Sequence, residues 1–527
     1  MQLKAIQDSA PSGREEDWHL DKDRQLALLA ERAEDDMCRA DALFERADYL
    51  NILGRHGEAV SVLESVLKMQ IATLKDSDDR LARTHQRLGR AYILIGSHHA
   101  AGAHFMEALA KVEASHGEAS LRAAECYFDL GRCYALLLLD TDGDKACDGL
   151  SAVDLHDVSK ISCTFLLAAR QIYAIPALDV PKDSPTGALL DAFHAAALVH
   201  TFSETTEAAD LIASARAVFE EQEDKEEYRA DRAFMISQAY VYLISSRLEG
   251  QNVYQPGTES QSLDFANRAV GLAELACGCR PHSDLARMHL EFARVLHEEC
   301  DVVDNAVREL LEALRIYKAS TGEASPCVIH TLHRLCVCAM GTAACVPYAR
   351  RMAKTSCVCY GGGSVEYARA LALLGQAMFE TVAQNSSKLR RDANKYLERA
   401  ILIVLNAQPG PSEEMGDVLW DLSLCLPQPT YFVFVRRVLQ LVLHPRSEKL
   451  EEAWMREAEL KYMDCAWPEE DEDDHEDDED GEGREESALE QGEEEEEEIE
   501  DGDLGVIPRS IEERTLKLPD WIIPEKA

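Results

Sequence analysis

Apolar and small residues recur at helical spacing along most of the chain, and the pattern is clearest between residues 82 and 121. Two amphipathic segments there flank a glycine, which predicts two helices joined by a turn. Gly89 and Ala101 are small enough to let the two backbones approach, and Tyr92 and Phe105 fill the remaining space. The residues that carry this packing are Leu88, Gly89, Tyr92, Gly96, Ala101, Phe105 and Ala108.

The same pattern recurs on both sides of this hairpin. Five pairs of equivalent residues are 42 positions apart: Gly54 and Gly96, Ala59 and Ala101, Leu88 and Leu130, Gly89 and Gly131, and Tyr92 and Tyr134. Later triplets with the same offsets begin at Ala306 and Ala393. Because self-similarity at such a period is typical of stacked helical repeats, the chain is predicted to form an array of helical hairpins up to about residue 426.

The order of the packing residues in this hairpin resembles a tetratricopeptide repeat (TPR). The 42-residue interval resembles the TPR variant of kinesin light chains, in which units end in a glycine-containing linker such as His116-Gly117-Glu118 here. The resemblance implies an all-α fold, a right-handed α-solenoid of about eight to ten TPR-like hairpins. It also implies a non-enzymatic scaffold or adaptor that binds a partner peptide or helix on the concave face.

Prolines, glycines and charge runs divide this array into segments. Pro176, Pro181 and Pro185 mark a joint, and prolines after residue 426 end the array. The expected segments are a disordered N-terminus (1–20), N-terminal TPR-like hairpins (21–140), an irregular insert and joint (141–187), a second TPR-like array (188–426), C-terminal capping helices (427–464), an acidic disordered tract (465–503) and a terminal apolar motif (504–527).

The first helix of a TPR hairpin lines the concave face, so the resemblance selects candidate partner-binding residues. These are Phe44, Asp48, Arg83, Gln86, Arg90, Phe128 and Arg132. Arg83, Arg90 and Arg132 would suit an acidic segment or a C-terminal carboxylate, through charge-assisted hydrogen bonds. In the alternative interpretation these arginines are solvated, or they pair with Asp48 and Glu125.

Charge is extreme and unevenly distributed. The formal net charge is -43, and the tract from Glu469 to Asp503 holds 24 acidic residues and one basic residue. A polyanion repels phosphates, so no nucleic-acid partner is expected. The tract either keeps the protein soluble or binds a basic partner, which makes a chaperone for histones or other basic proteins the alternative function. The closing motif around Trp521, Ile522 and Ile523 is apolar and is predicted to dock or to fray.

The remaining chemistry is sparse. Sixteen cysteines, no apolar leader and no membrane-length apolar run predict reduced thiols in a cytoplasmic protein, with the nucleus as the alternative. Three Cys-x-Cys pairs lack the Cys-x2-Cys spacing of a zinc module. His330, His333 and Cys336 could share one helix face as metal ligands, but side chains packed in the core of the array are the favoured interpretation, so no metal is expected. No phosphate-binding loop or catalytic motif occurs, so neither a cofactor nor an enzyme is expected. The oligomeric state stays open.

Overall fold

The computed structural model describes residues 15–407, apart from 34, 77, 142–151, 179–180, 182–183, 200–204, 224, 226–227, 229–230, 252–257, 279 and 382–386, together with residue 440. The chain divides into two compact units, Met1–Ala393 and Asn394–Ala527. The capping helices, the acidic tract and the motif of Trp521, Ile522 and Ile523 fall almost wholly outside the described residues.

Every regular element in the described part of the chain is helical. The α-helices are α1 (Glu15–Arg32), α2 (Asp36–Ile52), α3 (His56–Thr73), α4 (Asp79–Leu94), α5 (His98–His116), α6 (Leu121–Thr141), α7 (Ala152–Tyr173), α8 (Pro185–Leu198), α9 (Thr205–Gln222), α10 (Arg232–Gln251), α11 (Thr258–Cys277), α12 (Ser283–Arg294), α13 (Val303–Thr321), α14 (Pro326–Cys338), α15 (Cys345–Tyr360), α16 (Val365–Thr381) and α17 (Ser387–Ala407). A short 3₁₀-helix, η2 (Pro176–Leu178), and a short π-helix, η3 (Val295–Glu299), complete the regular elements of the described residues. None of these helices is long and apolar enough to cross a membrane.

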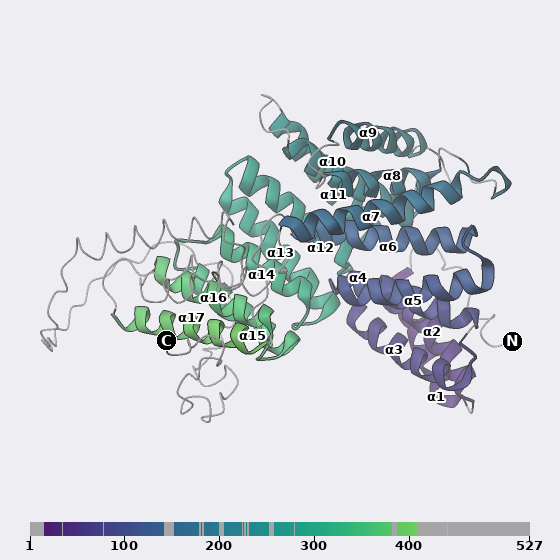
Figure 1. Ribbon diagram of the computed structural model, residues 1–527, viewed down its shortest axis with the longest axis horizontal. Helices are drawn as coiled ribbons and strands as arrows, with labels where there is room; N and C mark the ends of the chain where they lie inside the picture. Colours follow the sequence, from purple (N-terminus) through teal and green to yellow (C-terminus); the bar gives the residue numbers. More distant parts are fainter. Residues whose placement is uncertain are drawn as a thin grey trace, which may run out of the picture. The chain divides into compact units, whose positions relative to one another are not determined.

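Consecutive helices pack side by side as hairpins, from α2 with α3 to α14 with α15 (Figure 1). This confirms the predicted all-α array of helical hairpins. The first helices of the successive pairs begin at residues 36, 79, 121, 185, 232, 283 and 326, so the interval ranges from 42 to 64 residues. A uniform 42-residue period is therefore not confirmed, since the interval lengthens wherever longer loops or helices intervene.

Two helices begin inside segments that were expected to be irregular. Helix α1 starts at Glu15, within the N-terminus predicted to be disordered, and its Trp18 ring packs edge-on against Tyr49 of α2 at 5.8 Å. Helix α7 occupies much of the predicted insert, where Leu166 and Ala169 are fully buried. In both cases burial against a neighbouring helix stabilises the helix.

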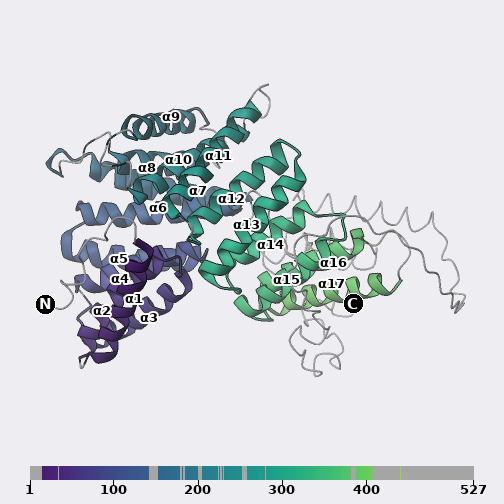
Figure 2. The same ribbon diagram turned by 180° about the vertical axis from the view of Figure 1, so that it is seen from behind.

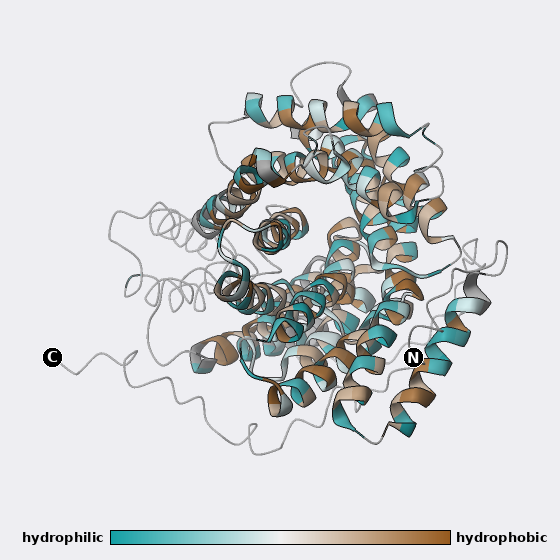
Figure 3. Ribbon diagram, turned by 90° about the vertical axis from the view of Figure 1, so that its right-hand side faces the viewer, coloured by the Kyte–Doolittle hydropathy of each residue, from teal (hydrophilic) through white to brown (hydrophobic). Residues whose placement is uncertain are grey.

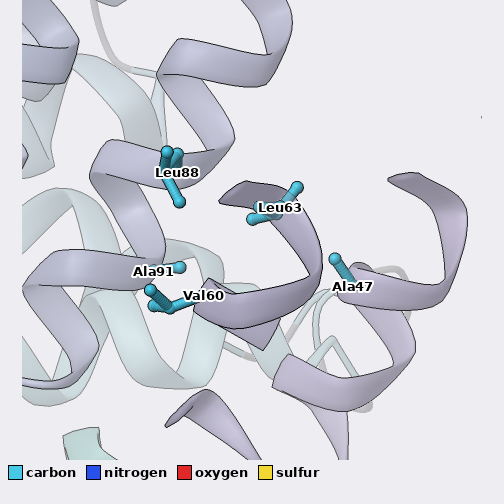
Figure 4. Packing of buried hydrophobic residues seen from close by; sticks show 5 residues of the cluster. All are labelled: Ala47, Val60, Leu63, Leu88 and Ala91. Atoms are coloured by element: carbon cyan, nitrogen blue, oxygen red, sulfur yellow. The ribbon is translucent and has the colours of Figure 1, made fainter. Parts of the chain in front are cut away.

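The N-terminal core is built from small and medium apolar side chains on three successive helices (Figure 4). Ala47 of α2, Val60 and Leu63 of α3, and Leu88 and Ala91 of α4 form one buried cluster. Along most helices apolar and polar residues alternate, as the colouring in Figure 3 shows. Each helix therefore buries one stripe of apolar residues against its neighbours, which is how a repeat array builds a continuous core.

Two helical glycines lie where a large side chain of the next helix packs directly against the helix backbone. A methyl group built on Gly89 would lie 2.6 Å from the Phe105 ring, so only glycine allows α4 and α5 to approach this closely. Gly131, at the equivalent position of α6, has the same relation to Leu166 of α7. Gly96 has a positive φ of 81°, which lets the chain turn between α4 and α5.

The N-terminal hairpins also contact hairpins that follow much later in the sequence. The α2–α3 turn, which contains Gly54, lies against Pro281, and the α4–α5 turn, which contains Gly96, lies against Cys327. His56 accepts a hydrogen bond from the backbone N–H of Ser283 at 3.3 Å. Figures 1 and 2 show α13 and α14 returning beside α3 and α4. The array thus closes back on its own first hairpins.

Candidate binding site

The helices α2, α4 and α6 carry the side chains predicted for the concave face, and polar contacts join these helices in series. Arg90 of α4 forms an ion pair with Asp129 of α6 at 2.8 Å, and Gln86 donates to the same carboxylate at 2.7 Å. Arg87 of α4 reaches back to Asp48 of α2 at 2.8 Å. We call this series of contacts the ladder.

The outer part of the ladder stays accessible to solvent. The side chains of Arg83, Arg90 and Asp48 are 59%, 51% and 42% exposed, whereas Asp129 is 3% exposed. The Asp129 carboxylate raises the pKa of Arg90, so this arginine stays charged. The guanidinium of Arg87 covers the Phe44 ring at 3.9 Å. One buried carboxylate, that of Asp129, thus holds the half-exposed side chain of Arg90 in position.

The remaining two predicted residues lie deeper. Phe128 of α6 contacts the ring of Phe193 on α8 at 6.2 Å. The Arg132 guanidinium lies over Phe193 at 5.5 Å and over Tyr240 of α10 at 5.2 Å, in cation–π geometry. These two side chains therefore join α6 to α8 and α10, whereas the other five lie on α2 and α4 and are partly exposed.

A buried ionic cluster lies where α6 ends. The Asp140 carboxylate accepts from the Arg287 guanidinium of α12 at 3.1 and 3.0 Å and from His98 Nε2 of α5 at 2.8 Å. Burial opposes ionisation, but Arg287 and His98 outweigh it and lower the pKa of Asp140 far below its ordinary value. Arg287 also donates to the Tyr240 hydroxyl at 3.0 Å. One carboxylate thereby connects α5, α6 and α12.

The cluster continues along α12 toward α10 and α14. Arg247 of α10 pairs with Glu291 at 2.8 Å and donates to the Leu139 carbonyl at 3.0 Å. Arg294 pairs with Glu291 and Glu299, and Arg334 of α14 pairs with Glu298 at 2.7 Å. Each of these arginines meets at least one carboxylate, so the cluster is internally balanced.

A hollow of about 290 Å³ adjoins Asp140. We call it the α5–α14 hollow, because its walls include the first residues of both helices. Its polar lining residues include His98, His99, Asp140, His330, Glu366 and Arg369. Burial lowers the pKa of His330 to about 3, so that imidazole is neutral near pH 7. Among the described residues no group of three or more His, Cys, Asp or Glu side chains is arranged to hold a metal ion.

Sequence reasoning did not select Asp140, Arg287 or His98. Asp140 ends the apolar run Ala135–Leu139, and a carboxylate in that position was one signal that something must compensate it. Arg287 lies 147 residues away, and neither residue belongs to the repeat pattern. No spacing rule links them, so only the folded chain reveals the pair.

Comparisons with known proteins give weak likenesses. No protein-family model matches the chain, and neither does any curated protein. Among solved structures, the crystal structure of BtubC (BKLC) from P. vanneervenii is 14% identical, with a TM-score of 0.36 over 50% of this chain and 95% of that chain. A monomeric IFIT1 mutant with Gppp-AAAA is 13% identical, with a TM-score of 0.29 over 84% of this chain and 95% of the other.

A human IFIT1 dimer with m7Gppp-AAAA is 11% identical, with a TM-score of 0.27 over 87% of this chain and 97% of that chain. At these scores the likenesses do not select a partner for this chain. They also give no support to the expectation that nucleic acid is not a partner, and that expectation stays a prediction, as does the compartment. What the helices themselves establish is an array of packed helical hairpins.

Proposed function

We propose that the protein is a non-enzymatic scaffold that binds a peptide or helix of another protein on the ladder surface. We define this surface by Phe44, Asp48, Arg83, Gln86 and Arg90. The observation that carries the proposal is that these side chains, on the first helices of two successive hairpins, are partly exposed and already held by neighbours, as Arg90 is by Asp129. A surface that is ordered before binding loses little side-chain entropy when a partner arrives.

The chemistry of the surface favours a partner segment of mixed charge. Arg83 and Arg90 offer guanidinium donors beyond those used in their ion pairs, and Asp48 offers a carboxylate. Phe44 adds an aromatic ring under Arg87. Such a surface recognises a segment through several moderate contacts, as is usual where charged groups provide specificity more than affinity.

The interior supports a scaffold more than an enzyme. Titratable groups do meet at the α5–α14 hollow, but the Asp140 carboxylate already accepts from Arg287 and His98. A general base needs a lone pair within reach of its substrate, and this carboxylate is engaged in joining helices. We therefore assign Asp140 a structural role.

The test is quantitative capture of binding partners by the full chain and by the double variant R83E/R90E. R315E on α13, which reverses another exposed arginine, is the matched control. We expect the double variant to bind the captured partner with at least about tenfold lower affinity, a difference of about 1.4 kcal/mol in binding free energy. The R315E variant should bind it with unchanged affinity. Undiminished capture by the double variant, with circular dichroism showing that it is folded, would refute the proposal.

The rival function is a chaperone for basic proteins, which the 24 acidic residues of the tract from 469 to 503 favour. Removing residues 465–527 separates the two functions. A scaffold that uses the ladder surface keeps its partner after the truncation. A chaperone loses its binding of a basic protein, such as a histone, after the truncation. In the full chain, the affinity of such a chaperone for the basic protein falls as the salt concentration is raised.

A further inference from the structure

Two histidine rings meet where the α2–α3 turn packs against the start of α12. His56 is the first residue of α3, and His282 directly precedes α12. The ring centroids are 4.7 Å apart, the ring planes are nearly perpendicular at 84°, and both residues are buried. We call these two rings, together with the backbone N–H groups of Ser283 and Asp284, the histidine latch.

Each ring of the latch holds a backbone N–H group of α12 with a nitrogen lone pair. His56 Nε2 accepts a hydrogen bond from the Ser283 N–H at 3.3 Å. His282 Nδ1 accepts one from the Asp284 N–H at 3.2 Å and thereby caps α12. A backbone amide only donates, so neither of these ring nitrogens carries a proton in the closed latch. The proton of neutral His56 therefore lies on Nδ1, which donates to the Asn51 side-chain oxygen at 3.2 Å.

Acid opposes this arrangement in two ways. A second proton on His56 would occupy Nε2 and face the Ser283 N–H, which removes the hydrogen bond between α3 and α12. A proton on His282 Nδ1 would remove the cap of α12 in the same way. Two imidazolium ions with centroids 4.7 Å apart would also repel each other. Protonation of either ring is therefore incompatible with the closed latch.

The charged groups around the latch do not remove this conflict. Asp284 of α12 has a carboxylate oxygen 3.4 Å from His282 Nδ1, and its charge favours protonation of both rings. Arg232 of α10 opposes a positive charge on both rings, and Arg280 opposes it on His282. Burial is the largest influence. Together with the arginines it lowers the pKa of His282 to about 4 and the pKa of His56 well below its ordinary value.

The contacts on either side of the latch have no group that titrates near pH 6. Arg232 donates to the Ile52 carbonyl at the end of α2 at 3.2 Å, and an arginine side chain keeps its proton throughout this range. Deeper in the molecule, Arg287 of α12 pairs with Asp140 of α6 and keeps that carboxylate ionised. Mild acid therefore acts on the contact between the α2–α3 turn and α12, and it leaves α6 joined to α12.

We propose that the histidine latch is a pH-sensitive contact, which holds the α2–α3 turn on the start of α12 at neutral pH and releases it in mild acid. A released, hydrated histidine binds a proton near pH 6.5, whereas the buried rings resist protonation to a much lower pH. The released form is therefore favoured as the pH falls below about 6.5, and the closed form returns as the pH rises. The latch shares no residue with the ladder surface, so it does not depend on the proposed function.

The test compares hydrogen exchange of the full chain at about pH 7.5 and about pH 5.5 by mass spectrometry, corrected for the intrinsic effect of pH on amide exchange. We expect the protection of residues 51–57 and 282–286 to fall at least about tenfold at the lower pH, because release binds two protons. At that pH both segments should exchange at least about tenfold faster than the core of α6, because only the latch opens. Unchanged protection of the two segments, or exchange no faster than that of α6, would overturn the proposal.

Variants assign the effect to the two rings. H56Q and H282N replace the accepting ring nitrogen by an amide oxygen, which accepts the same backbone N–H but binds no proton near pH 6. Asparagine is also a preferred N-cap, so H282N keeps the start of α12. The double variant H56Q/H282N should keep its protection at the lower pH. H330N, which replaces the histidine that lines the α5–α14 hollow, should lose protection of the two segments as the unmodified chain does.

Two results with these variants would contradict the proposal. The first is a loss of protection in H56Q/H282N as large as in the unmodified chain. The second is a loss that H330N removes as fully as the double variant does, since this would mean that the two segments exchange through global unfolding. The measurement on the unmodified chain decides without the variants, so the test does not depend on the folding of the double variant.

Discussion

Two parts of the same array are held together in different ways. In the N-terminal hairpins, α2 to α5, small residues such as Ala59 and Ala101 are fully buried, and larger apolar side chains fill the gaps between them. In helices α10, α12 and α14 the inward faces carry arginines that are nearly as buried, including Arg287 and Arg334 at 4% and 5% side-chain exposure. The first part depends on shape, and the second depends on complete pairing of charge.

The difference shows that helices in one array can be held together either by apolar packing or by buried ion pairs. Apolar packing contributes in proportion to the area removed from water, so it changes gradually when one side chain is altered. A buried ion pair stabilises little overall, but removing one partner leaves an unpaired charge in a region of low dielectric. Single substitutions should therefore act most strongly in the charged part.

The largest effect is expected from R287M, which leaves the Asp140 carboxylate without its guanidinium partner. Loss of one partner of a buried pair destabilises by about 3–5 kcal/mol. R315M, which removes an exposed pair with Glu312, should change stability by less than about 1 kcal/mol. Urea denaturation followed by circular dichroism measures both. The double variant D140L/R287M should recover part of the loss, and a small effect of R287M would mean that the two parts do not differ.

Next comes G89A, which tests shape in the N-terminal hairpins. The added methyl group would meet the Phe105 ring at 2.6 Å, and overpacking of this kind costs about 1–3 kcal/mol. Gly271 of α11 is a matched control, because no atom lies within 4 Å of a methyl group built there. G271A should stabilise by about 0.5–1 kcal/mol through helix propensity. The midpoints of thermal unfolding of both variants test this prediction. Equal shifts of the two midpoints would contradict the packing argument.

A pH effect of similar size is expected from the buried histidines. Burial lowers the pKa of His330 to about 3 and that of His282 to about 4. The unfolded chain binds these protons near pH 6.5, so stability falls as the pH falls below that value, by about 1.4 kcal/mol per pH unit for each histidine. H330N should remove about 2 kcal/mol of the loss between pH 6.5 and 5. The control is H99N, which replaces an exposed histidine. If H330N and H99N show the same dependence of the free energy of unfolding on pH, the prediction is wrong.

The smallest effect is expected from R83Q on the ladder surface. Arg83 pairs with Asp79 within α4 at 3.1 Å, and its side chain is 59% exposed. Exposed pairs four residues apart contribute about 0.3–0.5 kcal/mol, and added salt screens them. Urea denaturation at low and high salt should show a difference no larger than this. A loss above about 1 kcal/mol would show that the ladder is structural rather than a surface for a partner.

The local sequence pattern predicted the regular hairpins because the residues that pack together within a hairpin are close to one another in the sequence. Gly89 and Phe105 lie on the two helices of one hairpin, so helical spacing is enough to predict their contact. The inward arginines were predicted as a basic groove, and the paired alternative named Asp48 and Glu125. In the structure Arg87 takes Asp48, and Arg90 takes Asp129. Which carboxylate pairs with which arginine depends on rotamers that a pattern does not record.

By itself, the sequence determined that the chain is helical, that its helices pair into hairpins and that small residues lie where neighbouring helices pack together. These features depend on residues close together in the chain. Only the tertiary structure decided that Asp140 meets Arg287, 147 residues later, and that His56 meets Ser283, 227 residues later. The physical reason is cumulative: each hairpin adds a small rotation to the array, and only their sum determines which distant helices come into contact.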